Sequence, residues 1–169
     1  MTDFFADIDP DAVGARSLWI RRAVLLALTA IPVLALLNVF GQRPAESSFV
    51  GPAATLRVSA PRTVRGGIFF QARIDVRAHR DLPHPRLVLE RGWFEGLQVN
   101  STEPQPMTEA TRQGRVVLTY DKLEAGDLLR VWLQFEVNPT TVGRHPFDVE
   151  LDDAERPVAH ISRTLTLLP

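Results

Sequence analysis

Apolar and polar residues alternate along much of the chain after residue 54, and this period of two limits the fold more than any other feature. In "IFFQARIDVRAH" the apolar members are Phe70, Ala72, Ile74, Val76 and Ala78. In "LLRVWLQFEVN" they are Leu129, Val131, Leu133, Phe135 and Val137. Such alternation is typical of strands that pack one face on a core and turn the other to water.

Shorter stretches with the same pattern complete a β-domain. "HPFDVELDD" alternates strongly, and weaker strands are predicted at Thr55–Ala60, Arg86–Glu90, Gly114–Tyr120 and Ala159–Leu168. Turn-forming segments such as "APRTVRGG", "RDLPHP", "LEAGD" and "NPTTVG" separate them. Seven or eight strands within about 115 residues predict an antiparallel, immunoglobulin-like β-sandwich over residues 54–169. An open barrel with a similar number of strands is the alternative.

An uninterrupted apolar run precedes this domain. "AVLLALTAIPVLALLNVF", Ala23–Phe40, is 18 residues without a charge. As a helix it would extend about 27 Å, close to the ~30 Å hydrocarbon thickness of a bilayer. We therefore predict a single transmembrane helix that anchors the chain in the cell membrane, with the lipid bilayer as its first partner. A cleaved signal peptide and a buried core helix are the two alternatives.

The arginines around the run predict its orientation. Arg16, Arg21 and Arg22 precede it, and only Arg43 follows closely. An excess of basic residues on one side favours the cytoplasm for that side. The N-terminus is thus expected in the cytoplasm, and the domain after the span outside it.

The remaining segments are short. Residues 1–22 form the expected cytoplasmic tail, helical from about residue 10, because Asp9 is a good N-cap and Pro10 suits the first helical position. Residues 41–53, with two prolines and two glycines, read as a flexible linker. A chain of that length typically reaches roughly 20 Å, which would keep the domain near the membrane.

Composition excludes several classes of function. The chain has no cysteine, so disulfides, thiolate nucleophiles and cysteine-bound zinc are absent. Formal net charge is −1, which gives no general attraction to nucleic acid. The sequence contains no Gly-x-Ser-x-Gly elbow, His-Glu-x-x-His motif or phosphate loop. We therefore expect a non-enzymatic protein without a cofactor, and no small-molecule substrate is identified.

Two patterns resemble a known group of domains. "APRTVRGGIFFQARIDVRAHRDLPHPRLVLERGWFEGL" and "LEAGDLLRVWLQFEVNPTTVGRHPFDVEL" are similar to bacterial extracytoplasmic immunoglobulin-like modules of the CARDB and DUF11 kind. The resemblance covers roughly residues 60–151. It implies an adhesive, spacer or accessory module and carries no catalytic residues to this chain.

Two polar clusters are candidate metal sites. His79, Asp81 and His84 lie in the turn "HRDLPH", where two imidazoles and a carboxylate could converge on zinc, although turn histidines are commonly solvated. The acidic stretch "ELDDAE", residues 150–155, offers oxygens that calcium prefers, but an acidic turn between strands is usually just solvated.

Aromatic residues supply the candidate contact surface. The alternation places Trp93 with the core-facing residues, whereas Phe94, Trp132 and Phe69 fall on polar sides of their strands. Several exposed aromatics on one face would form a protein-binding patch. Asn38, near the outer end of the apolar run, could bond a partner helix or be solvated at the headgroups.

These features favour one function and leave two alternatives. The leading hypothesis is an accessory or structural subunit whose domain contacts another membrane or envelope protein. The second is an envelope glycan-binding module that stacks sugars on the same aromatics. The third is a metal-dependent enzyme or metal carrier that uses His79, Asp81 and His84.

Overall fold

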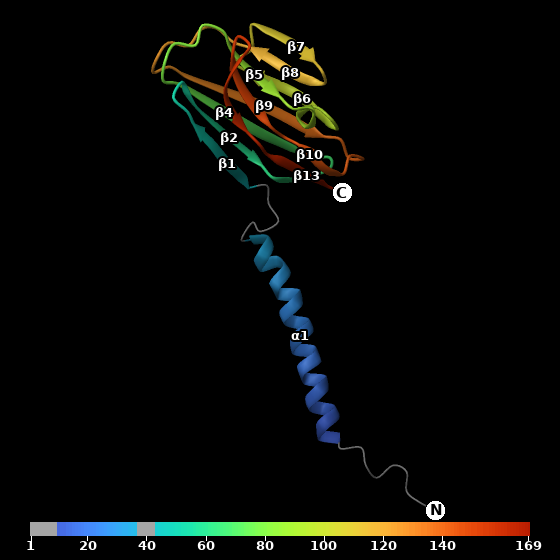
Figure 1. Ribbon diagram of the computed structural model, residues 1–169. Helices are drawn as coiled ribbons and strands as arrows, with labels where there is room; N and C mark the ends of the chain where they lie inside the picture. Colours follow the sequence, from blue (N-terminus) through green and yellow to red (C-terminus); the bar gives the residue numbers. More distant parts are fainter. Residues whose placement is uncertain (1–9, 37–42) are drawn as a thin grey trace, which may run out of the picture. The chain divides into compact units, whose positions relative to one another are not determined.

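The computed structural model describes residues 10–36 and 43–169, with side chains for 17–33 and 43–169. The chain divides into two compact units, residues 1–41 and residues 42–169 (Figure 1). Each unit is described by itself.

The described part of the first unit is one helix, α1, from Pro10 to Leu36. Its start agrees with the predicted helix from about residue 10. The Thr29 hydroxyl donates to the Leu25 carbonyl at 2.8 Å, so this polar side chain is satisfied within the helix. Within the described residues, no helix combines the length and the hydropathy that crossing a bilayer requires. The predicted span Ala23–Phe40 extends to residues 37–40, which lie outside the described residues.

The second unit is built from strands. They are β1 Pro44–Val50, β2 Ala54–Pro61, β3 Thr63–Arg65, β4 Phe69–Ala78, β5 Pro85–Leu89, β6 Leu97–Glu103, β7 Thr108–Arg112, β8 Arg115–Thr119, β9 Leu128–Val137, β10 Gly143–Pro146, β11 Val149–Asp153, β12 Arg156–Ile161 and β13 Thr164–Leu168. A single 3-10 turn, η1, covers Arg91–Trp93.

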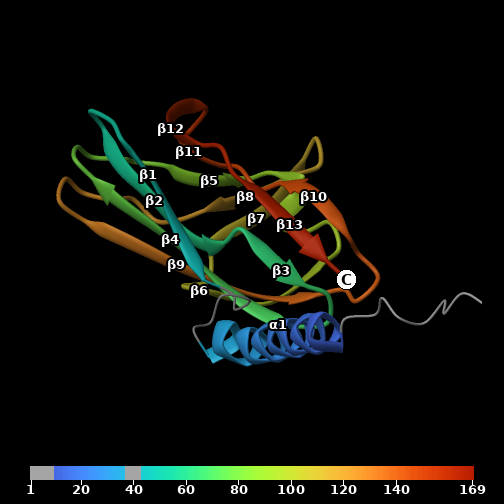
Figure 2. The same cartoon turned by 90° about the horizontal axis from the view of Figure 1, so that it is seen from below.

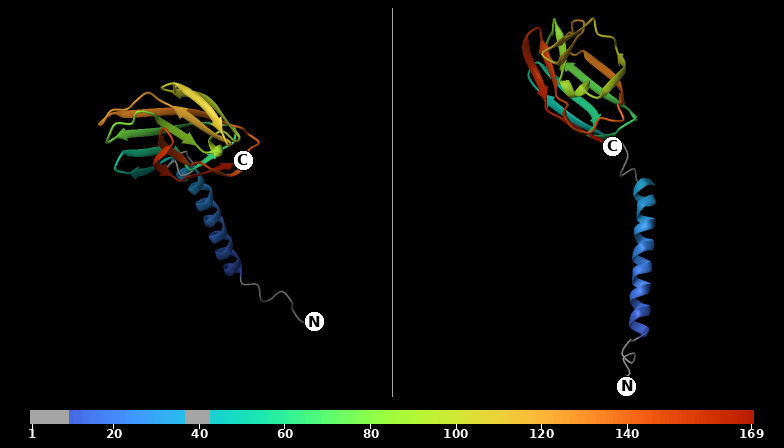
Figure 3. Two further views of the ribbon diagram at one scale, coloured as in Figure 1. Left: turned by 45° about the horizontal axis from the view of Figure 1, so that its top comes forward. Right: turned by 90° about the vertical axis from the view of Figure 1, so that its right-hand side faces the viewer.

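These strands form two five-stranded sheets and one small sheet. The β4–β9 sheet has the order β1-β2-β4-β9-β6, and the β5–β11 sheet has the order β12-β11-β5-β8-β7. The small sheet has the order β10-β13-β3, and its β13–β3 pair is parallel, whereas the other pairs are antiparallel. Figures 2 and 3 show the sheets as layers of an antiparallel β-sandwich.

One apolar cluster fills the space between the layers. The alternating residues of β4 and β9 named above all belong to it, except Leu129, which packs against it partly buried. Residues of the opposite sheet, such as Leu87, Leu89 and Leu151, are fully buried in the same cluster. The period-two prediction of the core is therefore confirmed for the central strands.

Trp93 is the largest fully buried side chain, as its position in the alternation predicts. Its ring stacks on Phe147 with centroids 3.6 Å apart, and its indole Nε1 donates to the Asp148 carbonyl at 3.0 Å. The preceding Gly92 permits this packing, because a Cβ there would meet the Pro146 carbonyl oxygen at 2.0 Å. The glycine before the tryptophan thus allows η1 to lie directly against β10.

The structure corrects several predicted elements. Residues 44–50, expected within a flexible linker, form β1 and pair with β2 along its whole length. Residues 108–112, which no predicted strand covers, form β7, and the expected single strand Ala159–Leu168 is two strands, β12 and β13, in different sheets. The described domain has 13 strands instead of seven or eight. The missed strands are mostly exposed edge strands, which carry no apolar alternation.

Candidate functional site

The outer face of the β4–β9 sheet carries the most organised group of polar and aromatic side chains. Register places Arg73 of β4 opposite Trp132 of β9, and Asp75 opposite Arg130. The Arg73 guanidinium carbon lies 5.5 Å from the centroid of the Trp132 ring, within the range of a cation–π contact. We call Glu46, Arg73, Asp75, Arg130 and Trp132 the Trp132 cluster.

Asp75 holds the arginines of this cluster in place. Its carboxylate accepts from Arg130 Nε at 2.7 Å and lies 3.3 Å from Arg73 Nε. Arg73 also pairs with Glu46 of β1 at 3.3 Å, so the network runs from the edge strand to β9. Because Asp75 is only 9% exposed, its pairs with Arg73 and Arg130 are less screened by solvent than ordinary surface ion pairs. The cluster is therefore ordered before any ligand arrives.

A hollow of about 340 Å³ opens beside this cluster. Its lining consists of Pro44, Ser59, Pro61, Phe70, Gln71, Arg73 and Trp132. Two aromatic rings and two prolines therefore share this lining with one amide, one hydroxyl and one guanidinium group. Such a surface can accept either a side chain of another protein or a small polar ring stacked on the indole.

The structure separates the aromatic residues that the sequence grouped into one patch. Trp132 is half-buried on the outer face, and Phe69, on the same face of β4, is 64% exposed. Phe94 instead packs partly buried against the core and lines a second hollow with Leu133 and Leu118. Leu133 follows Trp132 in β9, and successive strand residues point to opposite faces. Phe94 is thus not on the surface that Trp132 and Phe69 share.

The fourth predicted contact residue, Asn38, lies outside the described residues. Its predicted contact with a partner helix stays a prediction.

The three candidate metal ligands of the "HRDLPH" turn do not converge. His79 contacts the Gly51 carbonyl through Nδ1 and the Thr55 hydroxyl through Nε2, each at 3.0 Å. Asp81 accepts from the Ala125 amide at 2.9 Å, which ties two loops together. Across residues 10–36 and 43–169, no group of three histidine, aspartate or glutamate side chains is arranged to hold a metal ion.

The acidic stretch 150–155, the candidate calcium site, forms ion pairs with arginines. Its carboxylates pair with arginines on the outer face of the β5–β11 sheet: Glu150 with Arg115 at 3.1 Å, Asp152 with Arg86 at 3.8 Å and Glu155 with Arg112 at 3.9 Å. Burial, and after it the charge of Glu150, raises the pKa of Asp152, while Arg86 and Arg115 oppose this shift. Asp152 and Arg86 lie on the neighbouring strands β11 and β5, whereas Glu150 and Arg115 reach across β5 from β11 to β8.

Sequence reasoning found Trp132 and Phe69 but missed the charged members of the cluster. Arg73, Asp75 and Arg130 each lie on the polar side of an alternating strand, which the sequence shows. Their meeting depends on the register between β4 and β9, and no pattern within one strand fixes that register.

Comparisons with known proteins leave the family open. No family model matches the chain. No curated protein matches it either. Among solved structures, the domain is similar to a non-cellulosomal cohesin from the hyperthermophilic archaeon Archaeoglobus fulgidus. The match has 14% identity and a TM-score of 0.43, and it covers 73% of this chain and 91% of that chain. This likeness is remote and assigns neither a family nor a partner to the chain.

Proposed function

We propose that the chain is a non-enzymatic, single-pass membrane protein whose extracytoplasmic β-sandwich binds another membrane or envelope protein, as an accessory or structural subunit. The observation that carries this proposal is the Trp132 cluster with the neighbouring exposed Phe69. The membrane location rests on the sequence, namely the apolar run Ala23–Phe40 and the arginines before it.

The chemistry of the cluster favours a protein partner. Tryptophan and arginine are the residue types that most often dominate binding energy at protein interfaces. Here Asp75 fixes both arginines, so fewer side-chain rotamers have to be frozen when a partner binds. Phe69 extends the apolar part of the face beyond the hollow, which a small ligand would not need.

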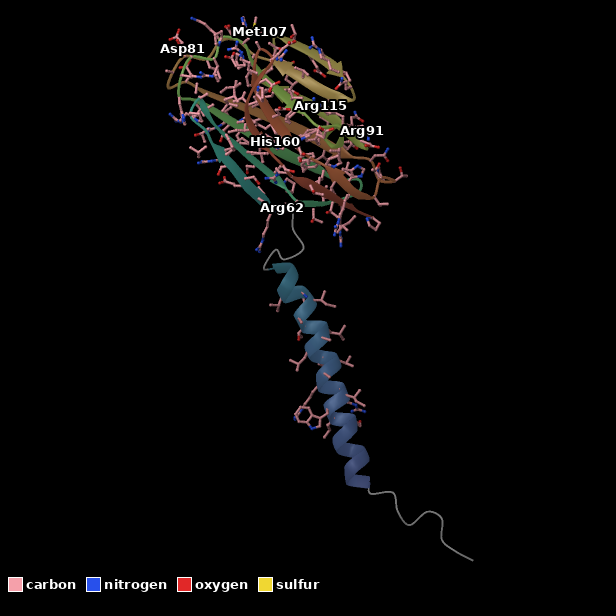
Figure 4. All side chains as sticks on the ribbon, in the orientation of Figure 1. Arg62, Asp81, Arg91, Met107, Arg115 and His160 are labelled. Carbon is pink, nitrogen blue, oxygen red and sulfur yellow. The ribbon has the colours of Figure 1, made fainter. Side chains whose placement is uncertain are left out.

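A pull-down from native membranes in mild detergent tests the proposal. We expect full-length tagged protein to retain one stoichiometric membrane or envelope protein, and Trp132→Ala with Phe69→Ala to lose at least tenfold of it, about 1.4 kcal/mol. Met107→Ala is the matched control, because Met107 is 69% exposed and lies in the loop between β6 and β7 (Figure 4). Unchanged partner recovery from the double variant would refute this surface.

An envelope glycan is the second candidate ligand, and the hollow itself favours it. One indole ring lies beside Gln71, Ser59 and Arg73, which could bond sugar hydroxyls. Titration of the full chain with cell-wall oligosaccharides, monitored by isothermal titration calorimetry, separates the two proposals. Saturable binding that Trp132→Ala abolishes would favour the glycan, and no binding would favour the protein partner.

A further inference from the structure

The end of the sandwich where the chain enters at Pro44 carries exposed apolar side chains. Phe69 is 64% exposed, Val142 54% and Leu168 39%. Pro44 pairs with Pro61 in the β1–β2 register, and the short β3 follows directly after it. We call Arg62, Arg65, Val142, Arg144 and Leu168 the entry end; Phe69 lies beside it and belongs to the surface shared with Trp132. Asp81 lies at the opposite end of the sandwich from Arg62 (Figure 4).

The segments that carry these residues form one continuous surface around Gly66 and Gly67. The Gly66 amide donates to the Leu168 carbonyl at 2.8 Å, and the Val137 amide donates to the Ile68 carbonyl at 3.0 Å. Backbone atoms of Pro139 lie so close to Gly66 that a Cβ there would meet them at 2.9 to 3.2 Å. The loop with Val142 is therefore packed beside the turn that leads to Phe69.

The charges at the entry end are mostly positive. Arg62, Arg65 and Arg144 are exposed, and no ion pair among residues 10–36 and 43–169 involves them. Two carboxylates lie nearby: Glu136 is opposite Phe69, and Glu95 is already paired with Arg91 at 3.5 Å.

The loops at the end of the sandwich that carries Asp81 have a different charge from the entry end. They carry Asp81, Asp121, Glu124 and Asp127 against Arg80 and Lys122. The named charges of these loops are therefore mainly negative, whereas those of the entry end are mainly positive.

The position of β1 shortens the tether to this end. Three residues separate Phe40, the last residue of the predicted span, from Pro44, the first residue of β1. Even fully extended, that connection covers roughly 14 Å. If the span is in the membrane, Pro44 therefore stays within reach of the lipid headgroups, closer than the predicted flexible linker would have kept it.

We propose that the entry end docks on a bilayer surface that contains anionic lipids. This inference rests on the proposed membrane location of the chain. Val142 and Leu168 enter the interfacial region, and the three arginines bind headgroup phosphates. Phe69, on the face that carries Trp132, remains part of the partner surface. A basic residue near an anionic surface contributes roughly a fivefold factor in affinity, so three of them matter together. Docking would also fix which faces of the domain remain open to a partner.

Labels on the full-length chain test this docking, since the chain has no cysteine of its own. Val142→Cys carries an environment-sensitive fluorophore, and Ala125→Cys, an exposed site in the loop that Asp81 binds, is the reference. Both proteins are reconstituted into vesicles of phosphatidylcholine with phosphatidylserine. We expect a blue shift and quenching by a bilayer-embedded quencher at residue 142 and neither at residue 125.

Charge variants make the test specific. Arg62→Glu with Arg65→Glu should reduce the quenching at residue 142 at least fivefold, and so should vesicles of phosphatidylcholine alone. Arg80→Glu, on the loop next to Asp81, should leave it unchanged. An anchored protein whose label at residue 142 is as exposed to water as that at residue 125 overturns the docking alone. Protein that an alkaline wash removes from the vesicles overturns the membrane location, and the docking inference with it.

Discussion

At the scale of single residues, Arg163 links strand β1 to the rest of the sandwich through hydrogen bonds. It is only 6% exposed, and its guanidinium donates to four oxygens of β1 and β2: the Ala45 carbonyl at 2.9 Å, the Ser47 hydroxyl at 2.8 Å, the Val58 carbonyl at 3.2 Å and the Ala60 carbonyl at 2.6 Å. Burial, and after it the charge of Arg62, lowers the pKa of this guanidinium. The side chain remains a donor to every strand it touches.

We expect Arg163→Met to lower the free energy of unfolding by about 2–4 kcal/mol, because several buried oxygens lose their donor at once. Urea denaturation followed by tryptophan fluorescence measures this. Arg156→Met removes an exposed arginine from β12 and should stay within about 0.5 kcal/mol of the natural chain. Equal stability of the two variants would mean that Arg163 does not hold β1.

Tyr120 should make the stability of the folded domain depend on pH in the alkaline range. Burial, and after it the charge of Glu109, raises the pKa of the phenol well above its usual value near 10. Above pH 10 the unfolded chain therefore loses this proton while the folded domain keeps it. Stability should fall with rising pH by up to about 1.4 kcal/mol per pH unit, until the raised pKa is passed.

Tyr120→Phe isolates this effect. The hydroxyl has no hydrogen-bond partner in the part of the chain that the structure describes. Near pH 8 the free energy of unfolding of the variant should therefore lie within about 1 kcal/mol of that of the natural chain. Near pH 11 it should be the more stable of the two. Because Tyr120 is the single tyrosine, absorbance also reports its ionisation directly. Parallel loss of stability in both proteins would contradict the assignment.

At the scale of elements, the sequence predicts strands well where one face of the sheet is buried and the other is exposed to solvent. β4 and β9 were predictable almost to the residue, because a buried face and a solvated face alternate along each. β1 and β7 were not, since both are edge strands in which most or all residues are exposed. Their strands form because a neighbour offers hydrogen bonds, and that information lies elsewhere in the chain.

The break between β12 and β13 has a similar origin. The apolar pattern continues from Ala159 to Leu168, so it predicts one strand. Asp148 interrupts it, because its carboxylate accepts from the Arg163 amide at 2.7 Å and from the Ser162 hydroxyl at 3.1 Å. The chain changes sheets at this point.

The Trp132 cluster was also predictable only in part. The sequence shows that its residues lie on the polar sides of their strands, but it does not show the register that brings them together.

The β11–β12 hairpin allows a prediction at this scale. Its two-residue turn begins with Ala154, whose φ of 56° lies in the left-handed region that favours glycine. Ala154→Gly should therefore stabilise the domain by about 0.5–1 kcal/mol. Ala110→Gly makes the same chemical change in strand β7 and should destabilise it. Urea denaturation of both variants checks the opposite signs, and a loss in both would show that the turn is not strained.

At the scale of the whole molecule, the proposals divide the surface of the domain by its chemistry. The Trp132 cluster combines an aromatic ring with fixed charges of both signs, which suits a specific partner. The entry end combines exposed apolar residues with unpaired arginines, which suits a lipid surface. The proposed function places the domain and the N-terminal tail on opposite sides of the membrane.

That arrangement is the last prediction. Arg16, Arg21 and Arg22 before the apolar run should keep the tail in the cytoplasm. In intact cells, we expect a membrane-impermeant maleimide to label Ala125→Cys, and to label Thr2→Cys only after the membrane is opened. Replacing the three arginines by glutamine should weaken this preference, because the orientation follows the basic residues. Labelling of residue 2 alone in intact cells would reverse the topology, and mature protein without residue 2 would instead show cleavage of a signal peptide.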